Sequence, residues 1–151
     1  MKKYLVTGGA GFIGSSIAKA VGAEIFDITH NQNILNEPQV LEASKNVDGI
    51  FHCAAKISVP ESFEKPEEYY SINVIGTKNI LATNKKIVFS SSAAVYGVST
   101  APVKENSLLK PESPYGQNKV DAEKILSVGS HIALRYFNVY PSRSGVISKF
   151  I

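Results

Sequence analysis

A glycine-rich segment near the start of the chain constrains the fold more than any other feature. Segment 7–14 reads TGGAGFIG and directly follows a short apolar run at positions 4–6. In such a segment Gly8 permits a tight turn, Gly11 lets the backbone approach a ligand, and Gly14 lets a following helix pack closely on a sheet. The backbone N–H groups and the dipole of that helix attract anions, so the segment predicts a strand-turn-helix unit that holds the pyrophosphate of a dinucleotide.

A second pattern, far away in the sequence, supplies reactive groups. Tyr115 and Lys119 are four residues apart, so they share one face of a helix. A serine triplet that ends at Ser92 follows an apolar run, so its hydroxyls should emerge at the carboxyl end of a sheet, where open α/β folds bind ligands. Lys119 and a positive nicotinamide ring would lower the pKa of Tyr115, which could then act as a base while Ser92 hydrogen-bonds the same substrate hydroxyl. An exposed helical pair without a chemical role is the alternative.

Short β-branched or aromatic runs alternate with longer helical ones along the chain. This alternation is typical of an α/β fold, here a Rossmann-type, doubly wound parallel sheet with helices on both faces. Residues 1–151 are expected to form one NAD-binding domain of this kind. The expected strands are Tyr4–Thr7, Glu24–Asp27, Ile50–Cys53, Ile87–Ser90 and Ile132–Tyr136, and the expected helices are Phe12–Val21, Pro38–Ser44, Glu67–Thr83 and Pro114–Leu126.

Composition narrows the class of protein. The 151 residues are 44% hydrophobic and 19% charged, which suits one ordinary core. The net charge of +3 is scattered along the chain, so nucleic acid is not an expected partner. No apolar stretch reaches the roughly 18 residues of a membrane-spanning helix, so no membrane partner is expected either. The single cysteine, Cys53, allows no intramolecular disulfide and suits a reducing cytoplasm.

The histidines show no metal-binding spacing, and no metal site is expected. His52 lies at the end of an expected strand, and we interpret it as a packed, hydrogen-bonded side chain rather than a ligand. Its neighbour Cys53 is interpreted as a small buried side chain, because the side chain of His52 should point to the opposite face of the strand.

Asp27 closes the second expected strand, thirteen positions after Gly14. A carboxylate at this point can accept hydrogen bonds from the ribose of an adenosine, and its charge repels a 2′-phosphate. The expected cofactor is therefore NAD rather than NADP. A surface aspartate in a turn is the alternative.

Six segments together resemble the extended short-chain dehydrogenases/reductases, and within them the NAD-dependent epimerase/dehydratase family. The resemblance runs from Met1 to about Asn138 and is strongest toward members that epimerise UDP-hexoses. The segments, which stand in the family's order, read TGGAGFIG (7–14), VDGIFHCAA (47–55), YSINVIGTKNIL (70–81), KKIVFSSSAAVYG (85–97), SPYGQNKVDAEKIL (113–126) and ALRYFNVY (133–140).

The resemblance implies roles for individual residues. Ser92, Tyr115 and Lys119 would be catalytic, and Ser92, Tyr115 and Asn138 would contact the substrate. Tyr136 and Phe137 would flank the nicotinamide. The cofactor would be bound by Gly8, Gly11, Phe12, Ile13, Gly14, Asp27, Asn33, Ile34, Cys53, Ala54, Ala55, Asn73, Ser90, Tyr115, Lys119 and Tyr136.

The resemblance further implies a reaction, the epimerisation of a nucleotide sugar of the UDP-glucose/UDP-galactose type at C4 through a transient 4-keto intermediate. Ala93 and Ala94 beside Ser92 favour this reaction over dehydration, because elimination needs a further acid and base and methyl groups cannot transfer protons. The alternatives are an NAD-dependent nucleotide-sugar dehydrogenase, reductase or dehydratase, and a non-catalytic NAD-binding module.

A homodimer is also implied, through the helices expected at 67–83 and 114–126. Both carry apolar residues beyond one core-facing stripe, which are Tyr69, Ile72, Ile80, Val120 and Ile125.

Several connections are shorter than the family pattern. Asn33 comes six positions after Asp27, and segment 81–84 runs almost directly into the next strand. The loop expected at 140–145 is also short. A crossover helix with its loops needs a dozen or more residues. The substrate-binding C-terminal part of the family is largely absent after segment 145–151. We therefore expect the natural protein to contain residues that this chain lacks.

Overall fold

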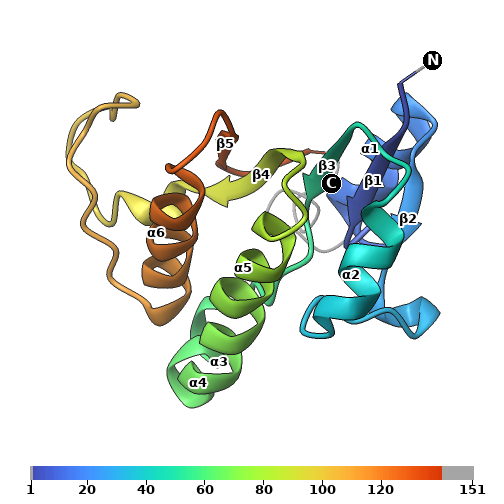
Figure 1. Ribbon diagram of the computed structural model, residues 1–151. Helices are drawn as coiled ribbons and strands as arrows, with labels where there is room; N and C mark the ends of the chain where they lie inside the picture. Colours follow the sequence, from blue (N-terminus) through green and yellow to red (C-terminus); the bar gives the residue numbers. More distant parts are fainter. Residues whose placement is uncertain (1, 141–151) are drawn as a thin grey trace.

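A computed structural model describes residues 2–140 of the chain. Five parallel strands form one sheet in the order β2-β1-β3-β4-β5 (Figure 1). They are β1 (Tyr4–Thr7), β2 (Glu24–Phe26), β3 (Gly49–His52), β4 (Lys86–Ser92) and β5 (Ile132–Tyr136). The strand order reverses between β1 and β3, and open parallel sheets bind ligands beside such a reversal, at the carboxyl ends of the strands. The predicted parallel α/β sheet is confirmed.

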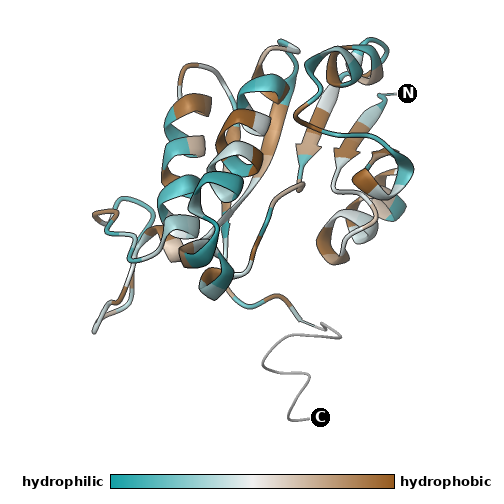
Figure 2. Cartoon of the chain, turned by 90° about the horizontal axis from the view of Figure 1, so that it is seen from below, coloured by the Kyte–Doolittle hydropathy of each residue, from teal (hydrophilic) through white to brown (hydrophobic). Residues whose placement is uncertain are grey.

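Helices cover the sheet. They are α1 (Phe12–Val21), α2 (Glu37–Ser44), α3 (Val59–Glu64), α4 (Pro66–Tyr70), α5 (Gly76–Leu81) and α6 (Pro114–Leu126). Helix α1 packs on β1, while α2, α5 and α6 lie side by side over one face (Figure 1). Apolar residues gather on the strands, and the helices carry both apolar and polar residues (Figure 2). The main core comprises Leu5, Phe26, Ile34, Val40, Val47, Ile50, Ile80, Ile87, Phe89, Ala122 and Leu126.

The observed strand ends differ from the expected ones by one or two residues. Strand β2 ends before Asp27, because this residue instead caps the short 3₁₀ turn η1 (Ile28–His30). Strand β3 ends before Cys53, and β4 continues to Ser92, which pairs with Tyr136 of β5. The longer β4 carries all three serines of the triplet out to the carboxyl edge of the sheet.

The helix expected at 67–83 is found at 66–81, but it is not a regular α-helix throughout. A π-helical turn, η2 (Ser71–Ile75), separates α4 from α5, and the N–H of Gly76 donates to the C=O of Ser71. This bond spans five residues where an α-helix spans four, so the residues that follow are rotated about the helix axis. Three of the apolar residues assigned to a dimer surface, Tyr69, Ile80 and Val120, are buried inside the chain, so the packing argument drawn from them is wrong.

Helix α3 was not anticipated, although the sequence carries a signal for it. Ser58 caps the helix, and its hydroxyl accepts a hydrogen bond from the N–H of Glu61 at 3.3 Å. The Ser-x-x-Glu spacing is the pattern of a capping box, and Pro60 lies in the first turn, where a missing N–H costs nothing.

The short connections close through residues in the left-handed conformation. Gly22 ends α1 at φ 63° and donates its N–H to the C=O of Ala18. Asn84 has φ 54° and lies in the turn between α5 and β4. The five residues between Asp27 and Asn33 leave no room for another strand, so the sheet has five strands in its described part where the six-stranded Rossmann order has one more. Most of segment 140–145, and all of segment 145–151, lie outside the described residues.

A half-buried ion pair joins β5 to α6. The guanidinium of Arg135 donates from Nη2 to Glu123 Oε2 at 2.7 Å and from Nε to Glu123 Oε1 at 3.0 Å. Its Nη1 also donates to the hydroxyl of Tyr96 and to the C=O of Glu105, both at 2.8 Å. The hydroxyl of Ser91 donates to the carboxylate of Glu123. These contacts fix α6, which carries Tyr115 and Lys119, relative to β5 and to β4, which carries Ser92.

Candidate functional site

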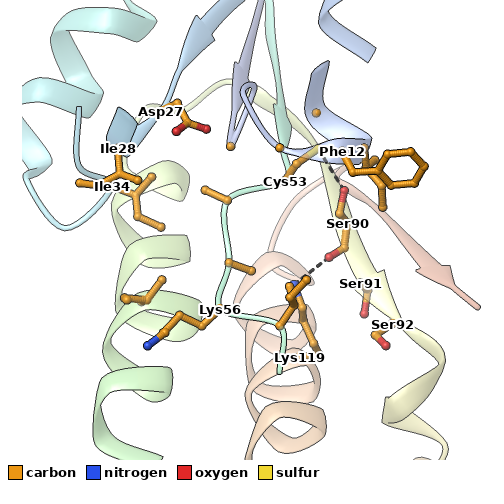
Figure 3. A pocket seen from close by; sticks show the side chains of 18 of the residues that line it. Phe12, Asp27, Ile28, Ile34, Cys53, Lys56, Ser90, Ser91, Ser92 and Lys119 are labelled. Atoms are coloured by element: carbon orange, nitrogen blue, oxygen red, sulfur yellow. Dashed lines mark hydrogen bonds between the residues drawn. The ribbon is translucent and has the colours of Figure 1, made fainter. Parts of the chain in front are cut away.

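A cavity of about 650 Å³ lies at the carboxyl edge of the sheet (Figure 3). Its volume is within the range of small-molecule and cofactor sites. Nearly all the residues that the sequence assigns to ligand binding line it. These are Gly8, Gly11, Phe12, Ile13, Gly14, Asp27, Asn33, Ile34, Cys53, Ala54, Ala55, Ser90, Ser92, Tyr115, Lys119, Tyr136 and Phe137. Asn73 and Asn138 are not among the lining residues.

The glycine turn has the geometry that an anion site needs. Gly8 has φ +67°, and a Cβ on it would come within 2.6 Å of the amide nitrogen of Ala54. A Cβ on Gly14 would lie 2.1 Å from the C=O oxygen of Gly8. Gly11 is the N-cap of α1, and no side chain caps this helix end. The backbone at the start of α1 therefore faces the cavity with its N–H groups unmasked by side chains.

Asp27 is held rigidly at the end of β2. Its Oδ1 accepts from the N–H and the hydroxyl of Thr29 at 3.0 and 2.9 Å, and its Oδ2 accepts from the N–H of Ala10 at 3.0 Å. Burial alone would raise the pKa of Asp27, but these hydrogen bonds outweigh it and hold the pKa below its usual value. A carboxylate has about four acceptor positions, so about one is left for a ligand hydroxyl.

Helix α6 delivers Tyr115 and Lys119 to the cavity from the other side. Ser113 caps the helix by accepting from the N–H of Gly116 at 3.0 Å, and Pro114 occupies its first turn. Both reactive side chains are buried, with 8% of Tyr115 and 3% of Lys119 exposed.

The ammonium of Lys119 is held between the sheet and the phenol. Its Nζ donates to the C=O of Ser90 at 2.8 Å and lies 4.6 Å from the ring centroid of Phe89. The ring centroid of Tyr115 is 5.8 Å away. Burial lowers the pKa of Lys119 to about 8, although Cys53 and Glu123 act in the opposite direction. Lys119 is therefore mostly charged at neutral pH but close to losing its proton.

The expected lowering of the Tyr115 pKa is not found in the chain alone. Burial raises the pKa of Tyr115, and its hydrogen bond with Ser92 only partly opposes this shift. Desolvation of the phenolate dominates the shift, and Lys119 is not among its causes. A lowered pKa of Tyr115 would therefore have to come from the positive charge of a bound nicotinamide ring, which is the other cause that the sequence suggests.

Cys53 and Ser90 lie between the two halves of the cavity. The hydroxyl of Ser90 donates to the Sγ of Cys53 at 3.2 Å, and burial raises the pKa of this thiol. A neutral thiol is a poor nucleophile, which agrees with a non-nucleophilic role, but Cys53 is half-buried on the cavity wall and not the buried side chain that the sequence predicted.

Asn73 and Asn138 differ in their surroundings. Asn73 is buried in η2, and its side chain holds the backbone of Lys56 through two hydrogen bonds of 2.9 and 3.0 Å. It therefore supports a lining segment from behind. Asn138 is exposed beyond the end of β5.

Several lining residues were not anticipated from the sequence, and they are Phe26, Ile28, Gln32, Leu35, Lys56, Ile57, Ile72, Ser91 and Val139. Phe26 and Ile28 flank Asp27 in the sequence, so their position next to it could have predicted that they line the cavity. The side-chain oxygen of Gln32 accepts a hydrogen bond from the N–H of Asp27 at 3.1 Å, and the ammonium of Lys56 forms an ion pair with the carboxylate of Glu68 at 2.8 Å. No spacing signals these two, because their positions depend on how the loops fold back.

Two absences concern residues 2–140. No group of three or more His, Cys, Asp or Glu side chains there could hold a metal ion. None of the helices in this range is long and apolar enough to cross a membrane.

The parallel sheet and the cavity beside its reversal define the class of Rossmann-type nucleotide-binding proteins. The chain belongs to the NAD-dependent epimerase/dehydratase family, whose family model matches residues 4–151.

Curated relatives support this assignment. The chain is 35% identical to the UDP-glucose 4-epimerase of Halalkalibacterium halodurans, over 89% of this chain and 50% of the relative. It is 36% identical to the UDP-glucose 4-epimerase of Mycoplasma pneumoniae, over 91% of this chain and 52% of the relative. The chain thus spans about half the length of the curated relatives it matches. The two alignments cover 166 and 177 residues, more than the 151 of this chain, so the relatives carry residues within the matched region that this chain lacks.

Solved structures give the same result. The structure of UDP-glucose 4-epimerase from Brucella ovis in complex with NAD has a TM-score of 0.85 and 34% identity, over 91% of this chain and 52% of that one. UDP-N-acetylglucosamine 4-epimerase from Methanobrevibacter ruminantium, in complex with UDP-N-acetylmuramic acid, has a TM-score of 0.85 and 31% identity, over 96% and 58% of the two chains.

The pKa of Lys119 predicts how the stability of the fold depends on pH. Because the pKa falls from 10.5 to about 8 on folding, the unfolded chain binds a proton between these values that the folded chain has released. The free energy of unfolding of the parent should therefore rise with pH in this window, relative to a Lys119→Met variant, by up to about 3 kcal/mol.

Urea unfolding of the parent and the Lys119→Met variant at about pH 7 and about pH 10 measures this difference. Lys78→Met, which removes an exposed lysine of α5 and keeps Lys119, is the control, and its free energy of unfolding should follow the same dependence on pH as the parent's. Parallel curves for the parent and the Lys119→Met variant would contradict the lowered pKa.

Proposed function

We propose that this protein binds NAD and epimerises a nucleotide sugar of the UDP-glucose/UDP-galactose type at C4. The observation that carries the proposal is that Ser92, Tyr115 and Lys119 line the same cavity as the glycine turn. A reactive group and a pyrophosphate site on one cavity are what a hydride-transfer reaction on a bound substrate requires. The relatives named as UDP-glucose 4-epimerases support the choice of reaction.

The residues present fit NAD. The uncapped start of α1 suits a pyrophosphate, and the close packing around Gly8 and Gly14 leaves the backbone bare at this point. The remaining acceptor position of Asp27 suits a ribose hydroxyl, and the charge of its carboxylate disfavours a 2′-phosphate. Bound NAD would supply a hydride acceptor and, in the return step, a hydride donor. We propose Asn33 and Ile34 as the adenine contacts and Tyr136 and Phe137 as the nicotinamide contacts, in line with their places on the cavity wall.

The chain's own residues would handle the proton. The phenol oxygen of Tyr115 takes the proton from the sugar 4-hydroxyl and later returns it. The ammonium of Lys119, anchored on the C=O of Ser90, favours the phenolate, and the hydroxyl of Ser92 orients the same sugar oxygen. Ala93 and Ala94 follow Ser92 in the 3₁₀ turn η3 (Ala93–Val95) and offer no second acid or base, which favours epimerisation over elimination.

Further parts of the proposal concern groups outside the cavity. Asn138, exposed at the end of β5, would reach the nucleotide sugar. A homodimer through α4, α5 and α6 is proposed from the family resemblance, and the exposure of Tyr70 on α4, at 43%, is compatible with it. Sedimentation at micromolar concentration tests the dimer, and a monomer would refute it. A cytoplasmic location stays a prediction from the single cysteine.

Tyr115→Phe tests the assigned base. Phenylalanine keeps the ring and its packing but removes the hydroxyl, so NAD binding should persist while interconversion of UDP-glucose and UDP-galactose falls by roughly 10²-fold or more. The assay uses the complete gene product. Turnover at the parental rate in the Tyr115→Phe variant would refute the role of Tyr115. In the parent protein, net accumulation of NADH would indicate a dehydrogenase. NAD binding without turnover in the parent would indicate a binding module.

Asp27→Asn tests the choice of cofactor. The amide keeps the shape of the side chain but removes its charge, so the preference for NAD over NADP should narrow by about 1–3 kcal/mol. Titration calorimetry with both dinucleotides measures the preference. Asp48→Asn is a matched control, since Asp48 is exposed and also accepts a backbone N–H, from Lys3 at 2.7 Å. An unchanged preference in the Asp27→Asn variant would show that Asp27 serves only the turn.

A further inference from the structure

His52 takes no part in the proposed chemistry, yet it is among the most buried polar residues, with 1% exposed. Both ring nitrogens are hydrogen-bonded. Nδ1 lies 2.7 Å from the hydroxyl of Thr7 at the end of β1, and Nε2 lies 3.0 Å from the hydroxyl of Thr77 on α5. The ring also stacks on Phe89 with a centroid separation of 5.5 Å. One histidine therefore connects the strand before the glycine turn to a helix on the face of the sheet.

The Thr77 end of this connection fixes the direction of the hydrogen bonds to the ring, because the Thr7 oxygen can accept the N–H of Ala54 and still either donate to Nδ1 or accept from it. At one end the N–H of Ala54, which can only donate, points to the Thr7 hydroxyl at 3.4 Å. At the other end the Thr77 hydroxyl donates to the C=O of Asn73, which can only accept, at 2.7 Å. The Thr77 oxygen must then accept from Nε2–H of His52, so Nδ1 of the neutral ring carries no proton and accepts from the Thr7 hydroxyl. Of the two neutral tautomers, only the one with its proton on Nε2 satisfies all four groups.

The connection returns to the wall of the cavity. The side chain of Asn73 accepts from the N–H of Lys56 at 2.9 Å and donates to its C=O at 3.0 Å. Ala54 and Lys56 both line the cavity, so the hydrogen bonds begin and end on the same lining segment, 54–56. Asn73 lies in the π-helical turn η2. Such turns are frequent at functional sites.

We propose that His52 is a positioning residue, whose Nε2–H tautomer couples the end of β1 and the glycine turn to segment 54–56 of the cavity wall. The inference rests on the proposed dinucleotide site, because the coupled elements form two sides of it. Burial, and after it the charge of Lys119, hold the pKa of His52 at about 3, so the ring stays neutral at physiological pH. A simple packing role for His52 would require the ring but not its tautomer.

Removing the acceptor at Thr77 separates the two roles. In Thr77→Val the Nε2–H loses its acceptor, so the proton should move to Nδ1 and donate to the Thr7 hydroxyl. That hydroxyl would then have to turn away from the ring. In Thr77→Ser the hydroxyl is kept, and the native tautomer should be restored. Thr83→Val is a matched control, because the Thr83 hydroxyl also bonds a helical C=O, that of Ile80 at 2.7 Å, but has no contact with the ring.

Two measurements on the full chain read out the effect. Long-range ¹H–¹⁵N spectra of the ring identify the tautomer, and titration calorimetry gives the affinity for NAD. We expect the Nε2–H form in the parent, in Thr77→Ser and in Thr83→Val, and the Nδ1–H form in Thr77→Val. NAD affinity should fall by about three- to tenfold in Thr77→Val alone.

Three other outcomes would contradict the inference. An Nδ1–H or charged ring in the parent overturns the inference even if the variants fail to fold. A switched tautomer with parental NAD affinity also overturns it, since the ring would then not be coupled to the site. A parent that binds no NAD overturns the proposed function, and the inference with it.

Discussion

The close approach of the β1–α1 turn to the end of β3 is the constraint on which the rest of the structure depends. A Cβ on Gly8 would lie 2.6 Å from the backbone of Ala54, and one on Gly14 would lie 2.1 Å from the C=O oxygen of Gly8. Only glycine allows strand, turn and helix to approach this closely. Because of this approach, the start of α1, the carboxylate at the end of β2 and the wall after β3 share one cavity.

The other side of the cavity depends on polar groups that are costly to bury. Lys119 has a pKa lowered to about 8, which means that the fold bears the cost of a desolvated ammonium. The C=O of Ser90 and the ring of Phe89 offset part of it. The pair of Arg135 and Glu123 then holds α6 against β5 one turn beyond Lys119. A buried lysine that weakens the fold is what one expects of a group retained for chemistry rather than for stability.

The sequence predicted the fold class, the five strands and most of the cavity wall, because these depend on local signals. Glycines, apolar runs and a four-residue helix spacing are visible without any knowledge of contacts between distant residues. Two features were not predictable, the π-helical turn at Ser71–Ile75 and the hydrogen bonds of the Asn73 side chain to the backbone of Lys56. Neither follows from a local sequence pattern. The raised pKa of Tyr115 was missed for a related reason, because burial is a property of the packed chain. Helix α3 was missed although the Ser-x-x-Glu signal was present.

Backbone amide hydrogen exchange of the full chain, with and without saturating NAD, tests whether the dinucleotide binds at the carboxyl edge of the sheet, because it shows which segments NAD protects. We expect NAD to slow exchange at segments 8–14, 27–34 and 53–57, and around Ser90 to Ser92, all at the carboxyl edge of the strands. Segment 98–110, which follows η3 and does not line the cavity, should exchange at the same rate in both states. Slowed exchange confined to segments away from the cavity, or no change anywhere at saturating NAD, would contradict the account.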